Sequence, residues 1–210
     1  MEYIKDEANK RDTDTVIHEK SVAETLNSTN AELRIRIIEQ KDTFMSGASF
    51  WERKYSTQIK RKFTIANKCT KEVKLRVLHF KLIHNIYPTN IVLNRMKIKA
   101  TEKCETCGVT DHIEHFFIKC ELLNGFWKSV ENTIRKYTNI NHITLTEENI
   151  LLGIDATEKM TTNQYLGCIN HIILIAKLSI SKFKCSKNET RFGLDLIFES
   201  KIRLRERYLN

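Results

Sequence analysis

The stretch CETCGVTDHIEHFFIKC, residues 104–120, decides the fold predicted for this chain. Its spacing of three cysteines and one histidine is Cys104-x2-Cys107-x7-His115-x4-Cys120. Two cysteines at this spacing bend the chain into a tight turn, and Gly108 can adopt the left-handed conformation that the turn needs. Three sulfurs and one imidazole nitrogen complete the tetrahedral coordination of Zn²⁺, which leaves no position for a catalytic water. The spacing therefore predicts one zinc ion with a structural role.

A second histidine in the same stretch leaves an alternative ligand open. The arrangement Cys107-x4-His112-x7-Cys120 fits common zinc spacings less well, so His115 is preferred. A thioredoxin-like redox site needs a strand before the cysteines and a helix directly after them, and the sequence indicates neither.

The distance in sequence between the last two ligands constrains the local helix. On an ideal α-helix, residues five apart such as His115 and Cys120 point about 140° away from each other. Both can face one ion only if the helix is broken or tightened near Lys119. We therefore predict that a segment capped by Asp111 and Glu114 ends near Cys120, where a separate helix begins.

Helical periodicity dominates the sequence on both sides of this stretch. Residues 70–87 place four apolar or aromatic side chains at helical spacing, Val73, Val77, Phe80 and His84, with Leu78 and Leu82 alongside. Thr70 is the predicted N-cap of this helix, and Pro88 ends it. Further helices are predicted over 90–96, 122–134, 147–152, 163–185 and 192–209. β-Branched residues leave a strand open for 163–185, although that segment is long for a strand. One proline and six glycines also disfavour a sandwich of short strands. The predicted fold is mainly α: a helical domain built around a small CCHC zinc knuckle.

Three regions are predicted along the chain. Residues 1–30 are polar without a sustained period, so we expect a flexible or weakly ordered arm. Residues 31–140 would form the zinc-binding domain, in which 31–40 fit either a helix or a strand. Residues 141–210 would form a C-terminal helical extension packed on that domain.

The composition of the 210 residues indicates the cellular compartment in which the protein is expected. Hydrophobic residues make up 41%, enough for a sizeable core, yet no run of 18 apolar residues suggests a transmembrane helix. The polar N-terminus lacks the apolar segment of a secretory signal. We therefore expect reduced cysteines and a nuclear or cytoplasmic location without membrane contact. Outside the zinc set, Cys168 and Cys185 are expected to be buried and Cys69 partly exposed.

Positive charge is concentrated in one part of the sequence. Residues 51–100 contain 13 basic and two acidic residues, a net charge of +11, whereas the whole chain carries +9. Such a block is typical of proteins that bind nucleic acid, although a solvated basic helix gives the same pattern. The candidate phosphate contacts are Lys60, Arg61, Lys62, Lys68, Lys71, Lys74, Arg76 and Lys81. The interleaved aromatic residues Phe80 and Tyr87 fall on the apolar pattern and are expected in the core.

Catalytic sequence motifs are absent from the chain. No phosphate-binding loop, HExxH, GxSxG or Tyr-x-Asp-Asp occurs in it.

Residues 51–137 nevertheless resemble the zinc-binding domain that follows the polymerase in reverse transcriptases of non-LTR (LINE-type) retrotransposons. The similar stretches are KLRVLHFKLIHNIYPTN at 74–90, the cysteine and histidine stretch itself, Phe126-Trp127 and ILLG at 150–153.

This resemblance implies a zinc knuckle on a helical support, which helps to hold RNA or target DNA within a larger polyprotein. Because polymerase and endonuclease motifs are missing, no enzymatic activity is expected of these residues themselves. Two hypotheses follow: a zinc module that binds RNA or DNA without sequence specificity, and a structural or protein-interaction module that belongs to a larger reverse transcriptase polyprotein.

Overall fold

A computed structural model describes residues 46–156, 163–185 and 191–205. Within these residues the structure is helical and contains no strand, which confirms the mainly α fold. The helices are α3 (Gly47–Tyr55), α4 (Ile59–Lys62), α5 (Ile65–Cys69), α6 (Val73–Ile83), α7 (Asn90–Arg95), α8 (Phe126–Thr138), α9 (Glu147–Leu152), α10 (Leu166–Cys185) and α11 (Arg191–Arg203). Three short helical turns complete them: η1 (His115–Lys119), η2 (Glu121–Leu123) and η3 (Asn163–Tyr165).

The described residues all belong to one compact unit. The arm predicted at 1–30 and the helix or strand predicted at 31–40 lie outside them. The boundary near residue 140 stays a prediction. The helix expected over 147–152 has those bounds, and the helices expected over 90–96 and 163–185 are present within three residues of theirs. Thr146 caps α9 as expected, since its hydroxyl accepts a hydrogen bond from the backbone N–H of Asn149 at 3.1 Å.

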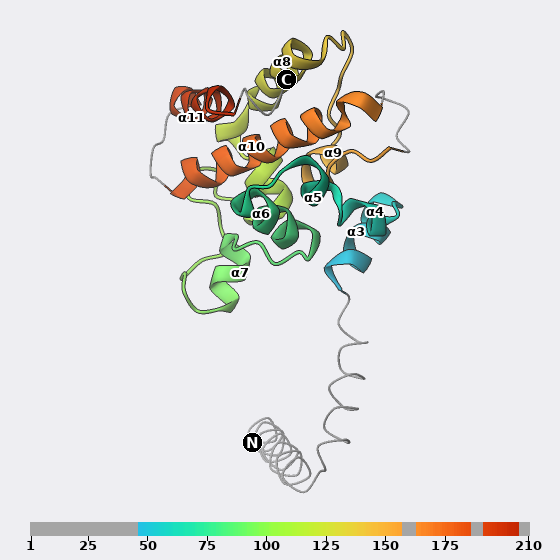
Figure 1. The fold of residues 1–210 in the computed structure, drawn as a ribbon. Coiled ribbons are helices and arrows are strands. Elements are labelled where there is room, and N and C mark those ends of the chain that lie inside the picture. The colour runs from blue at the N-terminus through green and yellow to red at the C-terminus, as the bar shows by residue number, and fades with distance from the viewer. Residues whose placement is uncertain (1–45, 157–162, 186–190, 206–210) are drawn as a thin grey trace, which may run out of the picture. The chain divides into compact units, whose positions relative to one another are not determined.

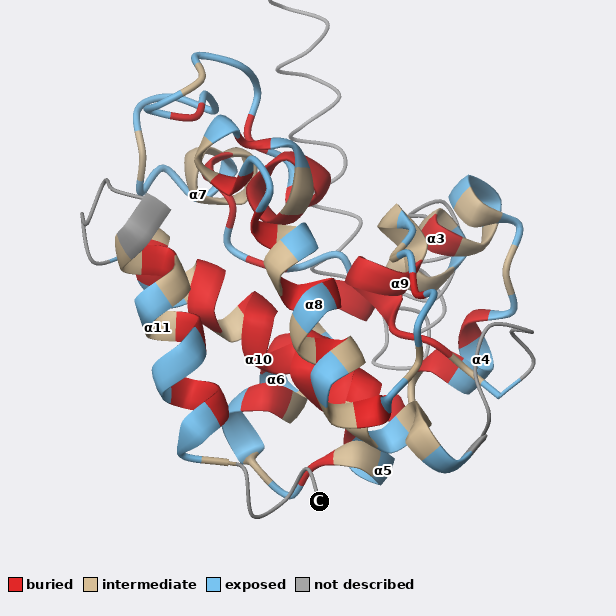
Figure 2. Ribbon diagram, turned by 90° about the horizontal axis from the view of Figure 1, so that it is seen from above, coloured by how far each residue is buried: buried red, intermediate tan, exposed pale blue. Residues whose placement is uncertain are grey.

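Helix α10 is the centre of the core. It packs against α5, α6, α8 and α11 (Figure 1). Most of its length is buried, as the red ribbon in Figure 2 shows. By length and composition alone α10 could cross a membrane, but 67% of its apolar window is buried inside the structure. A helix covered by its own neighbours in this way has the character of a core helix.

The predicted apolar stripe of helix α6 does not face the core, since Val73, Val77 and Phe80 are 68%, 45% and 54% exposed. The buried side chains are Leu78 and Leu82, which were expected alongside that stripe, and Leu75. Both faces are apolar, so periodicity alone cannot select between them, and packing against α10 and α5 decides. The expectation that Phe80 is a core residue was therefore wrong.

The start of α6 and the cysteines outside the zinc set bring further differences. Thr70 is not the N-cap of α6, which begins at Val73; its hydroxyl accepts a hydrogen bond from the N–H of Glu72 at 3.1 Å. Cys185 is exposed because it is the last residue of α10, and Cys168 is only partly buried. Apolar periodicity does not reveal that a helix end projects beyond its neighbours.

Candidate metal centre

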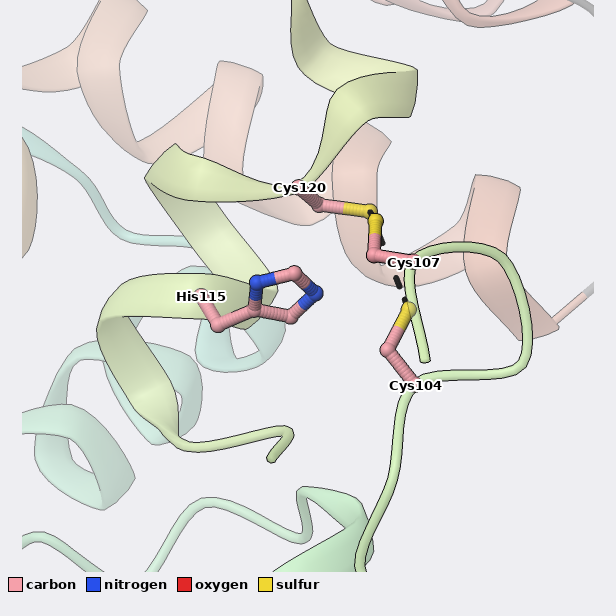
Figure 3. Close-up of side chains that lie close together, drawn as sticks. All are labelled: Cys104, Cys107, His115 and Cys120. Atoms are coloured by element: carbon pink, nitrogen blue, oxygen red, sulfur yellow. Dashed lines mark hydrogen bonds between the residues drawn. The ribbon is translucent and has the colours of Figure 1, made fainter. Parts of the chain in front are cut away.

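The four predicted ligands come together in space. One ligand atom from each of Cys104, Cys107, His115 and Cys120 lies within 4.8 Å of all the others (Figure 3). The Sγ atoms of Cys104 and Cys120 are 3.9 Å apart, and those of Cys107 and Cys120 are 3.6 Å apart. Zn–S bonds of about 2.3 Å in a tetrahedron place two sulfurs ~3.8 Å apart, whereas a disulfide needs about 2.05 Å. The spacing of these sulfurs is therefore that of a metal site.

His115 gives an independent test of this fit. One of its ring nitrogens points towards the three sulfurs (Figure 3). Its Nε2 atom is buried and has no hydrogen-bond partner among the described residues. An unsatisfied buried polar group costs about 1–3 kcal/mol, so a native fold normally provides it with a partner. A zinc ion would supply that partner, and the donor set of three sulfurs and one nitrogen suits it.

The protonation of His115 is consistent with a ligand role. Burial, and next the positive charge of Lys184, lower the pKa of His115 from its ordinary value. The ring is therefore neutral at physiological pH, and neutral imidazole is the form that binds a metal.

The first two cysteines sit on a knuckle held by backbone hydrogen bonds. The N–H of Gly108 donates to the carbonyl of Cys104 at 2.9 Å, and the N–H of Cys104 donates to the carbonyl of Val109 at 2.7 Å. Gly108 has a φ of +68°, so the predicted left-handed glycine is confirmed. An isolated bridge between Lys103 and Thr110 closes the knuckle at its base. The two thiols are thus positioned by main-chain bonds.

A π-helical turn positions the other two ligands. In η1 the N–H of Cys120 donates to the carbonyl of His115 at 3.0 Å, a bond over five residues instead of four. Cys120 itself is extended, with φ −64° and ψ 134°. The predicted break at Cys120 is therefore confirmed. The other predicted possibility was a tightened helix near Lys119, but η1 is wider than an α-helix. Because one π-type turn spans five residues, both side chains reach the same side.

The alternative ligand His112 lies outside the cluster. Its side chain is 48% exposed, and its Nδ1 accepts a hydrogen bond from the backbone N–H of His115 at 3.1 Å. His112 thereby caps the turn, a role that the sequence suggested for Asp111. The Asp111 carboxylate instead accepts a hydrogen bond from the N–H of Asn90 at 3.2 Å, which ties α7 to this region.

Two contacts that the sequence did not reveal hold the π-helical turn against the core. The indole N–H of Trp127, on α8, donates to the carbonyl of Phe117 at 2.8 Å. Lys54, on α3, forms an ion pair with Glu114, the residue just before His115. These partners are 10 and 60 residues apart in sequence, so no local pattern could have indicated them. Phe117 is also fully buried and contacts the ring of Tyr87.

The candidate phosphate contacts are divided by burial. Lys60, Arg61, Lys68, Lys71 and Lys74 are exposed, and Arg76 and Lys81 are partly buried. Lys62 is 1% exposed, and its Nζ donates to the carbonyl of Gly153 at 2.8 Å. It also lies 3.4 Å from a carboxylate oxygen of Glu148. In the folded protein Lys62 therefore cannot contact a phosphate, because its ammonium group is buried against Glu148 and the carbonyl of Gly153.

Comparison with known proteins agrees with the geometry. Residues 45–127 match a family described as zinc-binding in reverse transcriptase, and the match contains all four members of the cluster. No catalytic domain is detected beside it. No curated protein and no solved structure matches the chain. Residues 45–127 are therefore a zinc-binding domain of the reverse-transcriptase type, with a cluster suited to one zinc ion.

Proposed function

We propose that the chain is a nucleic-acid-binding module of a LINE-type reverse transcriptase, in which one structural zinc ion stabilises a basic helical surface. The observation that carries the proposal is the exposed basic block, which lies in the same compact unit as the metal cluster. The zinc domain of such an enzyme works beside a polymerase that handles RNA and DNA. The rest of a reverse transcriptase polyprotein is accordingly the proposed protein partner, in the nucleus or the cytoplasm.

The zinc ion has a structural role in this proposal. Cys104, Cys107, His115 and Cys120 supply all four positions of a tetrahedral site, so no open position remains for substrate or water. The ion joins the knuckle at 104–107 to the π-helical turn at 115–119, which packs on the core through Phe117. Because the ligands must lose their protons and come together, metal binding and folding of this region are coupled.

The basic block supplies the attraction for nucleic acid. Five exposed cations lie within residues 60–74: Lys60, Arg61, Lys68, Lys71 and Lys74. The only acidic residue between 60 and 81 is Glu72, which is paired with Arg205. The field of this surface is therefore positive and attracts a phosphate backbone without reading sequence.

Binding to a labelled single-stranded RNA between 50 and 300 mM salt tests the proposal. If all five cations contact phosphate, log K falls with log salt at a slope of roughly −3.5. Alanine at the five positions should weaken binding strongly and flatten the slope. The matched control replaces five exposed cations outside the block: Lys119, Lys128, Lys136, Lys182 and Arg203. Equal losses in both variants, or no binding by the zinc-loaded protein at 50 mM salt, would leave the structural or protein-interaction module as the better account.

A further inference from the structure

The outer face of α6 carries apolar side chains that no part of the described structure covers. Val77 and Phe80 are 45% and 54% exposed and border a hollow of about 260 Å³. Phe63 and Asn67, from the α4–α5 region, form part of the opposite wall. Neither the metal cluster nor the core uses Val77 and Phe80, whereas Phe63 packs against the core. The hollow is smaller than the roughly 300–1,000 Å³ of pockets for drug-sized ligands, so it suits a single flat ring.

Two aromatic rings that line this hollow, Phe63 and Phe80, both contact the ring of His84. The centroid of Phe80 lies 4.1 Å from that of His84, and the centroid of Phe63 lies 5.3 Å from that of His84. His84 is partly buried and contacts the ring of Phe80, which is itself 54% exposed, and Phe63 contacts His84 in turn. An exposed ring that packs on a neighbouring ring loses little conformational freedom when a further ring stacks on it.

Positive charge flanks the rings on both sides. Lys74 and Lys81 follow Val73 and Phe80 by one position, which places them about 100° round α6 from the apolar stripe. Arg76 lines the hollow on the opposite flank of the stripe. His79 also lines the hollow, and burial lowers its pKa to about 3, so this ring adds no charge beside that of Arg76. A ligand that fits this surface has an apolar aromatic ring with negative charges on either side of it.

We propose that the hollow beside Phe80 binds one unpaired base of single-stranded RNA, stacked on the Phe80 ring, with the adjoining phosphates on Arg76 at one flank and on Lys74 and Lys81 at the other. This inference rests on the proposed function and names how the strand is held. Aromatic rings among lysines are the usual means of binding unpaired bases. A duplex keeps its bases stacked inside and offers only phosphates, so this surface distinguishes single strands from duplexes. The side-chain amide of Asn67, also at the hollow, is placed to meet the edge of the base.

The test compares the full zinc-loaded chain with Phe80→Ala, Phe80→Trp and Val73→Ala. Val73 is the matched control, because it is 68% exposed on the same stripe but does not line the hollow. The probes are a labelled single-stranded RNA of twelve uridines and an RNA duplex of the same length. Phe80→Ala should weaken single-strand binding by roughly tenfold, because one stacked base is lost. Duplex affinity and the salt slope should stay the same, since no charge has changed. Phe80→Trp should keep the single-strand affinity, and Val73→Ala should match the parent protein.

Two results would overturn the inference. One is unchanged single-strand affinity in Phe80→Ala, and the other is an equal loss for single strand and duplex. Because Phe80 is exposed, the alanine variant should melt at the parent temperature, and a thermal melt checks this. Failure of the inference is distinguishable from failure of the proposed function. If Phe80→Ala binds normally while the five-cation variant does not, the basic surface still binds nucleic acid and only the base pocket is refuted.

Discussion

Replacing Lys177 by methionine should stabilise the zinc-loaded protein near pH 7 and destabilise it near pH 10. Lys177 lies at the centre of α10 with 0% exposure, and its Nζ donates to the carbonyl of Leu151 at 3.0 Å. Burial lowers its pKa from 10.5 to about 7, although the nearby Cys69 acts in the opposite direction. The unfolded chain therefore binds this proton more readily than the folded protein, so the contribution of Lys177 to stability rises as the pH increases from about 7 to 10.5.

The size of the effect follows from the pKa of Lys177. At about 1.4 kcal/mol per pKa unit, folding with this lysine costs ~4 kcal/mol near pH 7 and under ~1 kcal/mol near pH 10. Methionine removes that cost but leaves the carbonyl of Leu151 without its donor, a loss of about 1–3 kcal/mol. The net change in the free energy of unfolding is then a gain of ~2 kcal/mol near pH 7 and a loss of ~1 kcal/mol near pH 10.

Urea denaturation of both proteins at pH 7, 8, 9 and 10, loaded with zinc and free of excess metal, measures this difference. Titrating groups that do not interact with Lys177 cancel when the variant is subtracted from the parent protein, which leaves Lys177 and its neighbour Cys69. Lys182→Met is the control, because Lys182 is exposed on the same helix. A difference between Lys177→Met and parent that does not change with pH would refute the reasoning, since it would mean that the buried lysine stays charged at no cost.

Two further substitutions test the packing and capping of short helices. Gly47→Ala places a methyl carbon 2.1 Å from the carbonyl carbon of His84. This substitution should lower the free energy of unfolding by roughly 1–3 kcal/mol or prevent α3 from docking on α6. A thermal melt, followed by circular dichroism, that matches the parent protein would contradict this expectation. Thr146→Ala removes a capping box shared with Asn149 and should cost about 1 kcal/mol, measured by urea denaturation, while Thr146→Ser should retain most of that energy.

The parts of this fold that the sequence predicted are those set by short-range geometry. The ligand spacing fixes which four side chains can meet, and the angular separation of His115 and Cys120 required an interruption of the helix. The structure has that interruption at the extended Cys120, and a π-helical turn precedes it. The angular requirement could not reveal this turn, because a widened helix satisfies it as well as a tightened one.

The predictions that were wrong concern features that depend on tertiary packing. On α6 two apolar faces compete, and contacts with α10 bury the face with Leu75 and Leu78. The sequence suggests that Lys62 is a surface cation, but in the structure it is buried and donates a hydrogen bond to the carbonyl of Gly153, 91 residues away in sequence. Because such partners come from distant segments, periodicity and charge counts carry no information about them.

Native mass spectrometry of the purified chain measures whether the cluster binds zinc, with two matched pairs of variants. We expect one zinc ion per chain in the parent protein, and we expect its loss in His115→Ala and Cys120→Ser. Their partners, His112→Ala and Cys185→Ser, should keep the ion, because these residues lie outside the cluster. A chain that binds no zinc, or one that retains the ion in Cys120→Ser, would contradict the account.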